Sequence, residues 1–387
     1  MKVYKKENVF EAALDRIRWL FDEFDEVIVS SSGGKDSTVV FNLALQVAEE
    51  KDRLPLKVMF IDQEAEWRHT IEYMTRIMYD PRVKPYWYQM PIRIFNATSA
   101  TDHWLKCWDK EAEEKWVHPR QPIAITENVY GTERFNELFP AIAKVEYPNT
   151  RVCYLAGMRA DENPKRFVAM TQSLTYKWAT WGKVLNKSSE HYTMYPIYDW
   201  TSSDVWKAIV SNDWDFNKVY EQMYGHGVQL EKMRVSNLHH ETAVESLFNL
   251  QEIEGDTWNR MTNRLAGIDT AGKMGAEDFY MRDLPFVFKD WKEYRDYLLE
   301  HLILDPEDKS VFNEAFKLHD LAYEGTIGEN LYRMHVSAIL AQDVYLTKLA
   351  NFDMSVGFRQ RGALKSMNPD YPYLYLSLKP KKDKRSD

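Results

Sequence analysis

Cysteine is scarce in this chain of 387 residues, which contains only Cys107 and Cys153. So few thiols exclude a scaffold built on disulfides, and they exclude a metal or iron–sulfur centre held by four cysteines of one chain. An excess of basic residues is also missing, because 50 lysines and arginines face 59 acidic residues and the formal net charge is -9. The chain therefore lacks the overall positive charge that is typical of nucleic-acid-binding domains.

Long apolar runs are absent as well. No stretch of 18 apolar residues occurs, so we expect no membrane-spanning helix. Residues 1–10 begin basic, but Asp, Glu and Arg are interspersed through residues 11–26, which leaves no apolar core for a signal peptide. Hydrophobic residues still make up 44% of the chain, enough to bury a sizeable core. These observations predict a cytoplasmic globular protein with one large domain or two ordinary ones.

Short β-branched segments alternate with helical spacing in the first part of the chain. Strands are expected at residues 26–31, 56–62, 85–94 and 151–157, and helices at 9–24, 36–50 and 66–79. This order predicts an α/β fold with a doubly wound, mostly parallel sheet. Residues 95–150 are expected to form an insertion that covers the carboxyl edge of the sheet.

The second part of the chain is mainly helical in pattern. A helix is expected to begin near Asp204 with Ser202 or Ser203 as its N-cap. Further helices are expected at residues 241–266, 289–303, 309–322 and 329–351. The pattern predicts a nucleotide-binding domain over residues 1–215 and a mainly helical C-terminal domain over residues 216–387.

The segment SGGKDS (residues 32–37) follows the first predicted strand and opens the next predicted helix. A helix N-terminus offers unpaired N–H groups and a partial positive charge, and two glycines let an anion approach the backbone closely. Lys35 adds a positive charge, and Ser32 and Ser37 add hydroxyl donors. This combination predicts a site for a pyrophosphate group.

Two other interpretations of this segment compete with phosphate binding. The P-loop pattern G-x-x-x-x-G-K-[ST] does not fit, because Val29 occupies the place of its first glycine and Asp36 follows the lysine. A plain Ser/Gly turn that caps a helix is the other interpretation. The strand before the turn, the helix after it and the fixed offsets of Lys, Asp and Ser favour the phosphate site.

Three ordered elements resemble a known family. SGGKDS resembles the phosphate-binding signature of the ATP pyrophosphatases, or PP-loop proteins, of the adenine nucleotide alpha-hydrolase fold. Residues 157–162 (GMRADE) with Arg166, and residues 195–206 (YPIYDWTSSDVW), resemble elements of phosphoadenylyl-sulfate reductases and sulfate adenylyltransferase small subunits. The whole chain also resembles the bacterial and phage immunoglobulin-binding regulator A type, which is often paired with a ParB-like partner protein.

The resemblance implies ATP and Mg²⁺ as cofactors and cleavage between the alpha and beta phosphates of ATP. The AMP would pass to an acceptor, and pyrophosphate would leave. Lys35, Asp36 and Arg159 are the residues expected to be catalytic: Lys35 holds charge on the leaving pyrophosphate, and Asp36 holds the metal or positions the loop. The expected nucleotide-binding residues are Ser30, Ser32, Gly33, Gly34, Ser37, Asp62, Gly157 and Arg166. No set of protein side chains is predicted to form a metal site by itself, because the histidines lack metal-ligand spacing.

Other polar and aromatic residues have simpler interpretations. Asp161 and Glu162 are expected to pair with Arg159 and Arg166 in an ion network rather than to act as acid or base. The tryptophans of the insertion and its neighbourhood are expected to be core or interface residues rather than platforms for a base. These residues are Trp67, Trp87, Trp104, Trp108 and Trp116.

Three functions stay open at this point. The first is transfer of adenylate to a small oxyanion, a nucleic-acid base or a partner protein. The second is reduction or sulfur transfer from an adenylylated sulfate, but the related reductases use a cysteine near the carboxyl terminus, whereas Cys153 lies in a predicted buried strand and Lys35 is retained as in ATP users. The third is a nucleotide-sensing regulatory protein that acts with a ParB-like partner. The sequence predicts neither the acceptor nor the oligomeric state.

Overall fold

The structure is a computed structural model of the 387-residue chain. It describes residues 6–96, 98–99, 104–186, 188, 190–230, 233–235, 238, 244–269, 284–303, 305–323, 328–340, 346 and 349. The chain divides into two compact units, residues 1–273 and residues 274–387. The boundary predicted near residue 215 falls inside the first unit, and the division of function between the domains stays a prediction.

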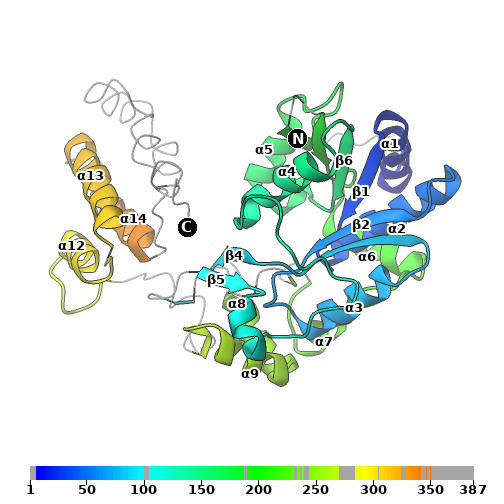
Figure 1. Ribbon diagram of the computed structural model, residues 1–387. Coiled ribbons are helices and arrows are strands. Elements are labelled where there is room, and N and C mark those ends of the chain that lie inside the picture. The colour runs from blue at the N-terminus through cyan, green and yellow to red at the C-terminus, as the bar shows by residue number, and fades with distance from the viewer. Residues whose placement is uncertain are drawn as a thin grey trace. The chain divides into compact units, whose positions relative to one another are not determined.

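A sheet of six strands forms the centre of the first unit among the described residues (Figure 1). Its strand order is β3 (Val83–Tyr88), β2 (Leu56–Ile61), β1 (Glu26–Ser30), β6 (Val152–Ala156), β8 (His191–Met194) and β7 (Gly182–Asn186). The first five strands run parallel, and β7 pairs antiparallel with β8 at one edge. The predicted α/β fold with a mostly parallel sheet is confirmed.

Helices cover both faces of this sheet. The first face carries α1 (Val9–Glu23), α2 (Lys35–Glu50), α3 (Arg68–Met78) and α6 (Ser202–Ser211), whose apolar side chains share one core with the strands. The opposite face carries α4 (Phe135–Glu146), and Phe139 of α4 packs against Tyr154 of β6. Neighbouring residues of β6 point to opposite faces, because Cys153 lies in the first core while Tyr154 meets α4. Burial on both sides explains the continuous apolar runs of the central strands.

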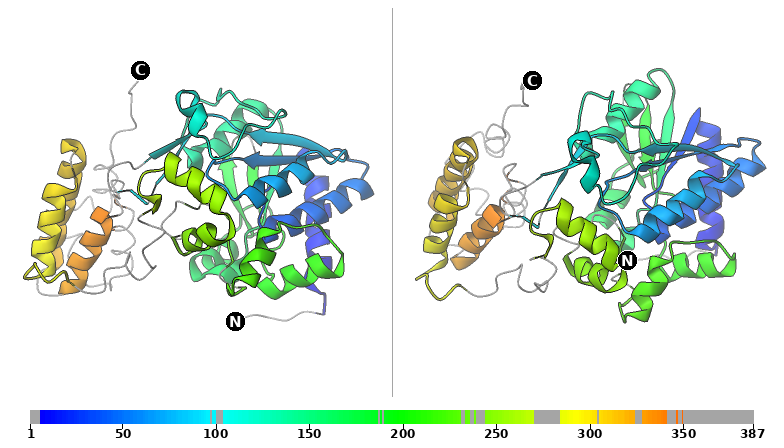
Figure 2. Two further views of the ribbon diagram at one scale, coloured as in Figure 1. Left: turned by 90° about the horizontal axis from the view of Figure 1, so that it is seen from below. Right: turned by 60° about the horizontal axis from the view of Figure 1, so that its bottom comes forward.

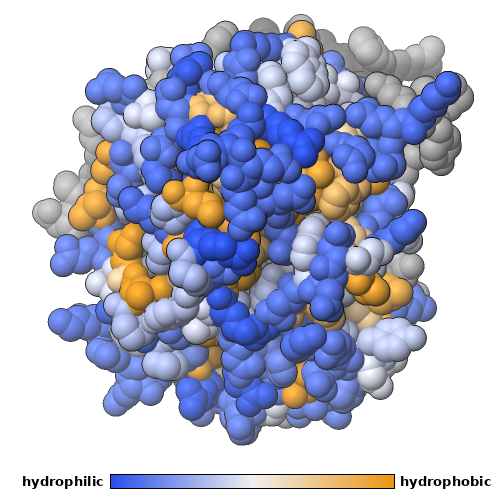
Figure 3. Space-filling model, turned by 90° about the vertical axis from the view of Figure 1, so that its right-hand side faces the viewer, coloured by the Kyte–Doolittle hydropathy of each residue, from blue (hydrophilic) through white to orange (hydrophobic). Residues whose placement is uncertain are grey.

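Four shorter helical segments also belong to the first unit. They are the 3₁₀ helices η1 (Lys110–Lys115) and η2 (Ala160–Glu162) and the helices α5 (Pro164–Thr171) and α7 (Val219–Gly225). None of the helices that the structure describes is both long enough and apolar enough to cross a membrane. The face in Figure 3 is mostly hydrophilic with scattered hydrophobic residues, so no broad apolar patch gathers there.

The third predicted strand and the predicted cap of α6 differ in the structure. The third strand ends at Tyr88, and residues 92–95 form β4 (Ile92–Phe95), which pairs antiparallel with β5 (Trp104–Cys107) in a separate two-stranded sheet. The break coincides with Pro91, which cannot donate a ladder hydrogen bond. Helix α6 is capped by Thr201 rather than by Ser202 or Ser203, since the Thr201 hydroxyl accepts from the Asp204 amide and the Asp204 carboxylate accepts from Thr201 N.

The helix expected over residues 241–266 is two helices in the described residues, α8 (Val244–Ile253) and α9 (Gly255–Arg264). Figure 2 shows both against the body of the sheet domain. Glu254 separates them, and its buried carboxylate accepts hydrogen bonds from the amides of Arg68 at 2.7 Å and His69 at 3.1 Å. Glu254 thereby caps the N-terminus of α3, so α8 and α9 are tied to the sheet domain by a specific polar contact.

The second unit is helical where it is described. Its helices are α12 (Trp291–His301), α13 (Pro306–Tyr323) and α14 (Glu329–Leu340). Phe312 and Phe316 pack in its apolar core, and buried Arg295 pairs with Asp320 at 2.8 Å. These helices agree with the three predicted there, although the last eleven residues of the predicted 329–351 helix lie almost wholly outside the described residues.

The sheet order creates a crevice at the ends of β1 and β6. Strand β1 is followed in sequence by β2 on one side, whereas its other neighbour is β6. The connections after β1 and after β6 therefore leave the sheet toward opposite faces, and the space between them is the place where open α/β sheets bind ligands. The SGGKDS loop follows β1, and residues 157–166 follow β6.

Candidate functional site

The SGGKDS loop turns sharply between β1 and α2. Gly33 has a φ of +71°, a conformation that L side chains rarely adopt, and an added Cβ would lie 2.7 Å from Cγ2 of Thr70. Gly34 is the N-cap of α2 and supplies no side-chain cap. The glycines therefore shape the turn and leave the first amides of α2 without a local hydroxyl or carboxylate cap.

Hydroxyl groups hold this turn in place from the inside. Ser37 Oγ donates to the carbonyl of Gly34 at 2.9 Å, and Ser31 Oγ accepts from the Gly33 amide at 3.3 Å. The hydroxyl of buried Tyr220, on α7, accepts from the Lys35 amide at 3.0 Å. Burial raises the pKa of Tyr220 well above its usual range, so this hydroxyl stays neutral. The loop is thus fixed before any ligand binds.

The loop after β6 packs directly on the first turn of α2. A Cβ on Gly157 would lie 2.6 Å from the backbone carbon of Asp36 and 2.6 Å from the Ser37 amide nitrogen, so only glycine fits. Two residues later, Arg159 Nε donates to Asp36 Oδ1 at 2.5 Å. Lys35 Nζ lies 3.0 Å from the other oxygen of the same carboxylate. Asp36 thus bridges Lys35 and Arg159, and it positions both cations beside the helix N-terminus.

Arg166 approaches the same space from α5. That helix begins at Pro164 and is capped by Asn163, whose side chain accepts from the Arg166 amide at 2.9 Å. The Arg166 guanidinium pairs with Glu162. Burial lowers the pKa of Arg166, and the nearby positive charge of Arg234 lowers it further. Arg166 is therefore a partly dehydrated cation with another cation close by.

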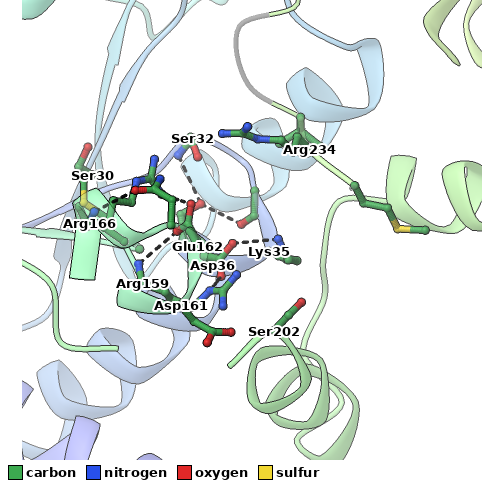
Figure 4. A pocket seen from close by; sticks show the side chains of 18 of the residues that line it. Ser30, Ser32, Lys35, Asp36, Arg159, Asp161, Glu162, Arg166, Ser202 and Arg234 are labelled. Atoms are coloured by element: carbon green, nitrogen blue, oxygen red, sulfur yellow. Dashed lines mark hydrogen bonds and ion pairs between the residues drawn. The ribbon is translucent and has the colours of Figure 1, made fainter. Parts of the chain in front are cut away.

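These groups line one pocket with a volume of about 490 Å³ (Figure 4). Its size is within the range of small-molecule sites. Every predicted site residue lines it except Gly33 and Asp62; those present are Ser30, Ser32, Gly34, Lys35, Asp36, Ser37, Gly157, Arg159 and Arg166. In Figure 4 the Lys35, Asp36 and Arg159 side chains converge at its centre. Residues from two separate motifs thus form one cationic site.

Asp62 lies elsewhere, in a buried hydrogen-bond network. Its carboxylate accepts from Trp87 Nε1 and Gln89 Nε2, each at 2.9 Å, and it lies 3.2 Å from His118 Nε2. Burial by itself would lower the pKa of His118, but Asp62 reverses the effect and raises it. The side chain of Asp62 is fully buried and does not line the pocket. Contact between Asp62 and a nucleoside stays a prediction.

The tryptophans near the insertion are mostly core residues, as expected. Trp67, Trp87 and Trp108 are fully buried, and Trp116 is nearly so. Trp104 is exposed. None of the five lines the pocket.

Several pocket residues escaped the sequence reasoning. They are Ala156, Met158, Asn163, Ser202, Tyr220, Met233, Arg234 and Val235, besides the carboxylates Asp161 and Glu162 that were expected only in an ion network. Arg234 lies within the segment YGHGVQLEKMRVSNL (residues 224–238) that carries part of the resemblance to the immunoglobulin-binding regulator A type. This segment was the only sequence feature that could have pointed to Arg234, but it contains no motif whose chemistry is known.

Metal-binding side chains would be a further chemical feature of this site. Within the described part of the chain, no group of three or more His, Cys, Asp or Glu residues could hold a metal ion. Mg²⁺ needs fewer protein ligands, because it usually combines one or two carboxylates with phosphate oxygens and water. Asp161 and Glu162 are carboxylates on the pocket wall that fit this lesser requirement.

Both cysteines are fully buried, burial raises the pKa of each thiol, and neither lines the pocket.

Most of the site lies in a segment that matches a known family. The model described as "Phosphoadenosine phosphosulfate reductase domain" matches residues 26–226. Residues 227–359 match a second family, described only as a domain of unknown function, DUF3440. Arg234 therefore belongs to the second match although it lines the pocket of the first.

Two similar proteins cover most of the chain. An uncharacterized Escherichia coli K12 protein, YbdN, is 29% identical over 320 residues, which cover 78% of each chain. Adenosine 5'-phosphosulfate reductase 1 of Bacillus subtilis is 19% identical over 68% of this chain and 94% of its own.

Two solved structures also resemble the chain at low identity. FMN adenylyltransferase of Candida glabrata has a TM-score of 0.34 and 15% identity over 56% of this chain and 62% of its own. Phosphoadenylyl-sulfate reductase of Candida auris, in a phosphate complex, has a TM-score of 0.32 and 14% identity over 62% of this chain and 98% of its own.

Proposed function

The chain belongs to the phosphoadenosine phosphosulfate reductase domain family, and from this premise we propose that it binds ATP and cleaves it between the alpha and beta phosphates. The products would be pyrophosphate and an adenylylated acceptor. The observation that carries the proposal is the bridge made by Asp36, which holds Lys35 and Arg159 together at the N-terminus of α2. A helix N-terminus with two cations beside it is suited to a polyphosphate.

Each group has a role in this reaction. An acceptor oxygen attacks the alpha phosphorus, the bond from that phosphorus to the bridging oxygen breaks, and pyrophosphate leaves with the electron pair. The acceptor proton goes to solvent. The Lys35 ammonium group and the positive end of the α2 dipole neutralise the charge that develops on the pyrophosphate, which is the electrostatic form of catalysis. Arg159 is oriented by Asp36 and holds a phosphate oxygen with its remaining N–H groups.

Magnesium fits this site as a cofactor shared with the nucleotide. Asp161 and Glu162 would hold the ion together with phosphate oxygens, and the ion would add positive charge at the phosphates. Glu162 also positions Arg159, because it accepts from the Arg159 amide at 3.1 Å. The protein's own part in catalysis is therefore to position the phosphates and to neutralise their charge.

The family's name supports a second candidate, reduction of an adenylylated sulfate. That reaction needs a nucleophile for sulfur, and the only two thiols of the chain are buried outside the pocket. Cys153 lies within β6, and Cys107 Sγ donates to the Gln63 carbonyl at 3.1 Å. Both positions suit small core side chains rather than reactive thiolates. We therefore place adenylyl transfer first.

An assay of pyrophosphate release tests the proposal. Purified protein is incubated with ATP, Mg²⁺ and a panel of acceptors, which includes sulfate, nucleosides and candidate protein partners. Pyrophosphate and AMP-linked products support adenylyl transfer, whereas release of sulfite from adenylylated sulfate with a thiol reductant supports the reductase. Binding of ATP with no product from any acceptor would favour a nucleotide-sensing role instead.

A further inference from the structure

The segment 233–235 is built into the wall of the pocket from beyond the residues that match the reductase family. Met233 and Val235 are buried, with 1% and 4% of their surfaces exposed. Val235 packs over the turn, because a Cβ on Gly34 would lie 3.4 Å from its Cγ2. The residue between these two anchors, Arg234, is exposed and lines the pocket. Two buried apolar side chains thus flank the residue that carries the positive charge.

Arg234 differs from the other cations of the pocket in having no acidic partner. Lys35 and Arg159 share Asp36, and Arg166 pairs with Glu162. In the described part of the chain, no carboxylate forms an ion pair with Arg234. In Figure 4 its side chain extends toward the pocket from the side opposite Arg166. Its guanidinium therefore keeps all its donors for a ligand.

Arg166 and Arg234 also interact with each other. After burial, the positive charge of Arg234 is the largest cause that lowers the pKa of Arg166. Two guanidinium groups on one pocket repel each other, and a tetrahedral oxyanion that lies between them removes the repulsion. Such a group would be distinct from the pyrophosphate at the helix N-terminus, because Lys35 and Arg159 already serve that position.

We propose that Arg234 forms, together with Arg166, a second oxyanion subsite of this pocket, for a phosphate or sulfate group other than the one held at the SGGKDS loop. The inference rests on the proposed nucleotide site and names the chemistry of what binds beside it. The oxyanion comes from one of two sources, a further phosphate of the nucleotide or a separate acceptor, and the test below distinguishes them. In either case the region of unknown function contributes a ligand-binding residue to the nucleotide site.

Calorimetric binding to Arg234→Ala and Arg234→Lys tests this subsite. The probes are AMP, ADP, the α,β-methylene analogue of ATP, and sodium sulfate added to protein saturated with that analogue. Arg68→Ala is the matched control, because Arg68 is an exposed arginine of α3 that pairs with Glu72 and does not line the pocket. Thermal unfolding of each variant shows that it is folded.

The expected result is a loss of affinity of about tenfold or more for one class of probe in Arg234→Ala, with a smaller loss in Arg234→Lys. A loss for the ATP analogue but not for AMP assigns the oxyanion to the nucleotide. A loss for sulfate alone assigns it to an acceptor. Affinities within twofold of the Arg68→Ala values for every probe would overturn the inference.

Together with the assay of pyrophosphate release, these binding measurements separate this inference from the proposed function. If binding of the analogue depends on Arg234 but the wild-type protein never releases pyrophosphate from ATP, the catalytic proposal alone is refuted. If the wild-type protein and Arg234→Ala release pyrophosphate equally well and bind every probe equally tightly, the subsite alone is refuted. Failure of the wild-type protein to bind any probe refutes both.

Discussion

Arg159 Nε lies 2.5 Å from Oδ1 of Asp36, and this ion pair joins the loop after β6 to the first turn of α2. The side chain of Arg159 is 6% exposed and that of Asp36 is 18% exposed, so water screens the pair only in part. Lys35 shares the same carboxylate from the other side. The two loops of the crevice are therefore held together by one acidic side chain between two basic ones.

Replacement of this carboxylate should destabilise the protein. In Asp36→Asn, Lys35 and Arg159 face each other without a counter-charge, and we expect a loss of about 3 kcal/mol in the free energy of unfolding. Urea unfolding measures it. Asp15→Asn is the control, because Asp15 is exposed and pairs only at the surface with Arg18, and its change should stay within about 0.5 kcal/mol. Inorganic pyrophosphate should restore part of the lost stability in Asp36→Asn, and no restoration would count against an anion site between the two cations.

Removal of the lysine should affect chemistry more than folding. Lys35→Ala deletes the cation that faces the leaving pyrophosphate, and we expect kcat for pyrophosphate release to fall by about 10²–10³-fold. The Tm should change little, since Asp36 keeps Arg159 as its partner. Steady-state kinetics and thermal unfolding on the same preparation check both expectations. Equal rates of release in the variant and the wild-type protein would show that Lys35 has no role in the reaction.

Close contact between the crevice loops should make Gly157 intolerant of substitution. The Cβ of Gly157→Ala would lie 2.6 Å from backbone atoms of Asp36 and Ser37, which cannot move like the end of a side chain. We expect a loss of about 1–3 kcal/mol in stability and weaker ATP binding as α2 shifts. Gly255→Ala at the start of α9 is the control, because no atom lies within 4 Å of its added Cβ. A neutral Gly157→Ala variant would mean that the loops separate at little cost.

The turn and the first helices of the sheet domain were predictable because their signals are local. The SGGKDS segment sits between a β-branched run and a helix-spaced run, and the structure places α2 at Lys35–Glu50. The cap of α6 also has a local signal, because Thr201 precedes Asp204 by the three residues that a capping box requires. The predicted caps, Ser202 and Ser203, were chosen because they lie immediately before Asp204, and this prediction was wrong.

Other parts of the structure depend on contacts between distant residues. Strands β7 and β8 escaped prediction because GKVLN and HYTM are short and lack a regular alternation of apolar residues. Arg234 is near the pocket because its buried neighbours Met233 and Val235 anchor it there, and Val235 packs beside Gly34, which is far away in the sequence. Asp62 lies one residue beyond the end of β2, which ends at Ile61, and His118, Gln89 and Trp87 surround it. The rule that ligands bind at the carboxyl ends of parallel strands places a residue at that edge of the sheet, but it does not predict which loops cover the residue.

Loss of both thiols should leave the proposed reaction intact. Cys107→Ser keeps a donor for the Gln63 carbonyl, and Cys153→Ala avoids a hydroxyl group within the core. We expect the double variant to lose about 1–3 kcal/mol of stability and to keep pyrophosphate release per folded molecule within about twofold. Circular dichroism measures the folded fraction and the release assay measures the rate. A folded double variant without activity would revive the sulfur-reductase function.

Glu254 should make stability depend on pH in the acid range. Burial alone would raise the pKa of this carboxyl group, but hydrogen bonds from the side chain and amide of His69, the amide of Arg68 and the hydroxyl of Thr257 lower it below the ordinary value of 4.5. The unfolded chain therefore binds this proton at a higher pH than the native state does. The stabilisation is fully present above about pH 4.5 and is lost as the pH falls through the native pKa.

Glu254→Gln should expose this dependence because the amide cannot carry the charge that caps α3. We expect the variant to be less stable than the wild-type protein by about 1.5–3 kcal/mol at pH 7, with the difference shrinking as the pH falls below about 4.5. Glu252→Gln on the exposed side of α8 is the control and should show no such change. Urea unfolding across this pH range measures the difference. A difference between Glu254→Gln and wild type that stays constant from pH 7 to pH 3 would show that the carboxylate charge contributes nothing to the contact between α8–α9 and α3.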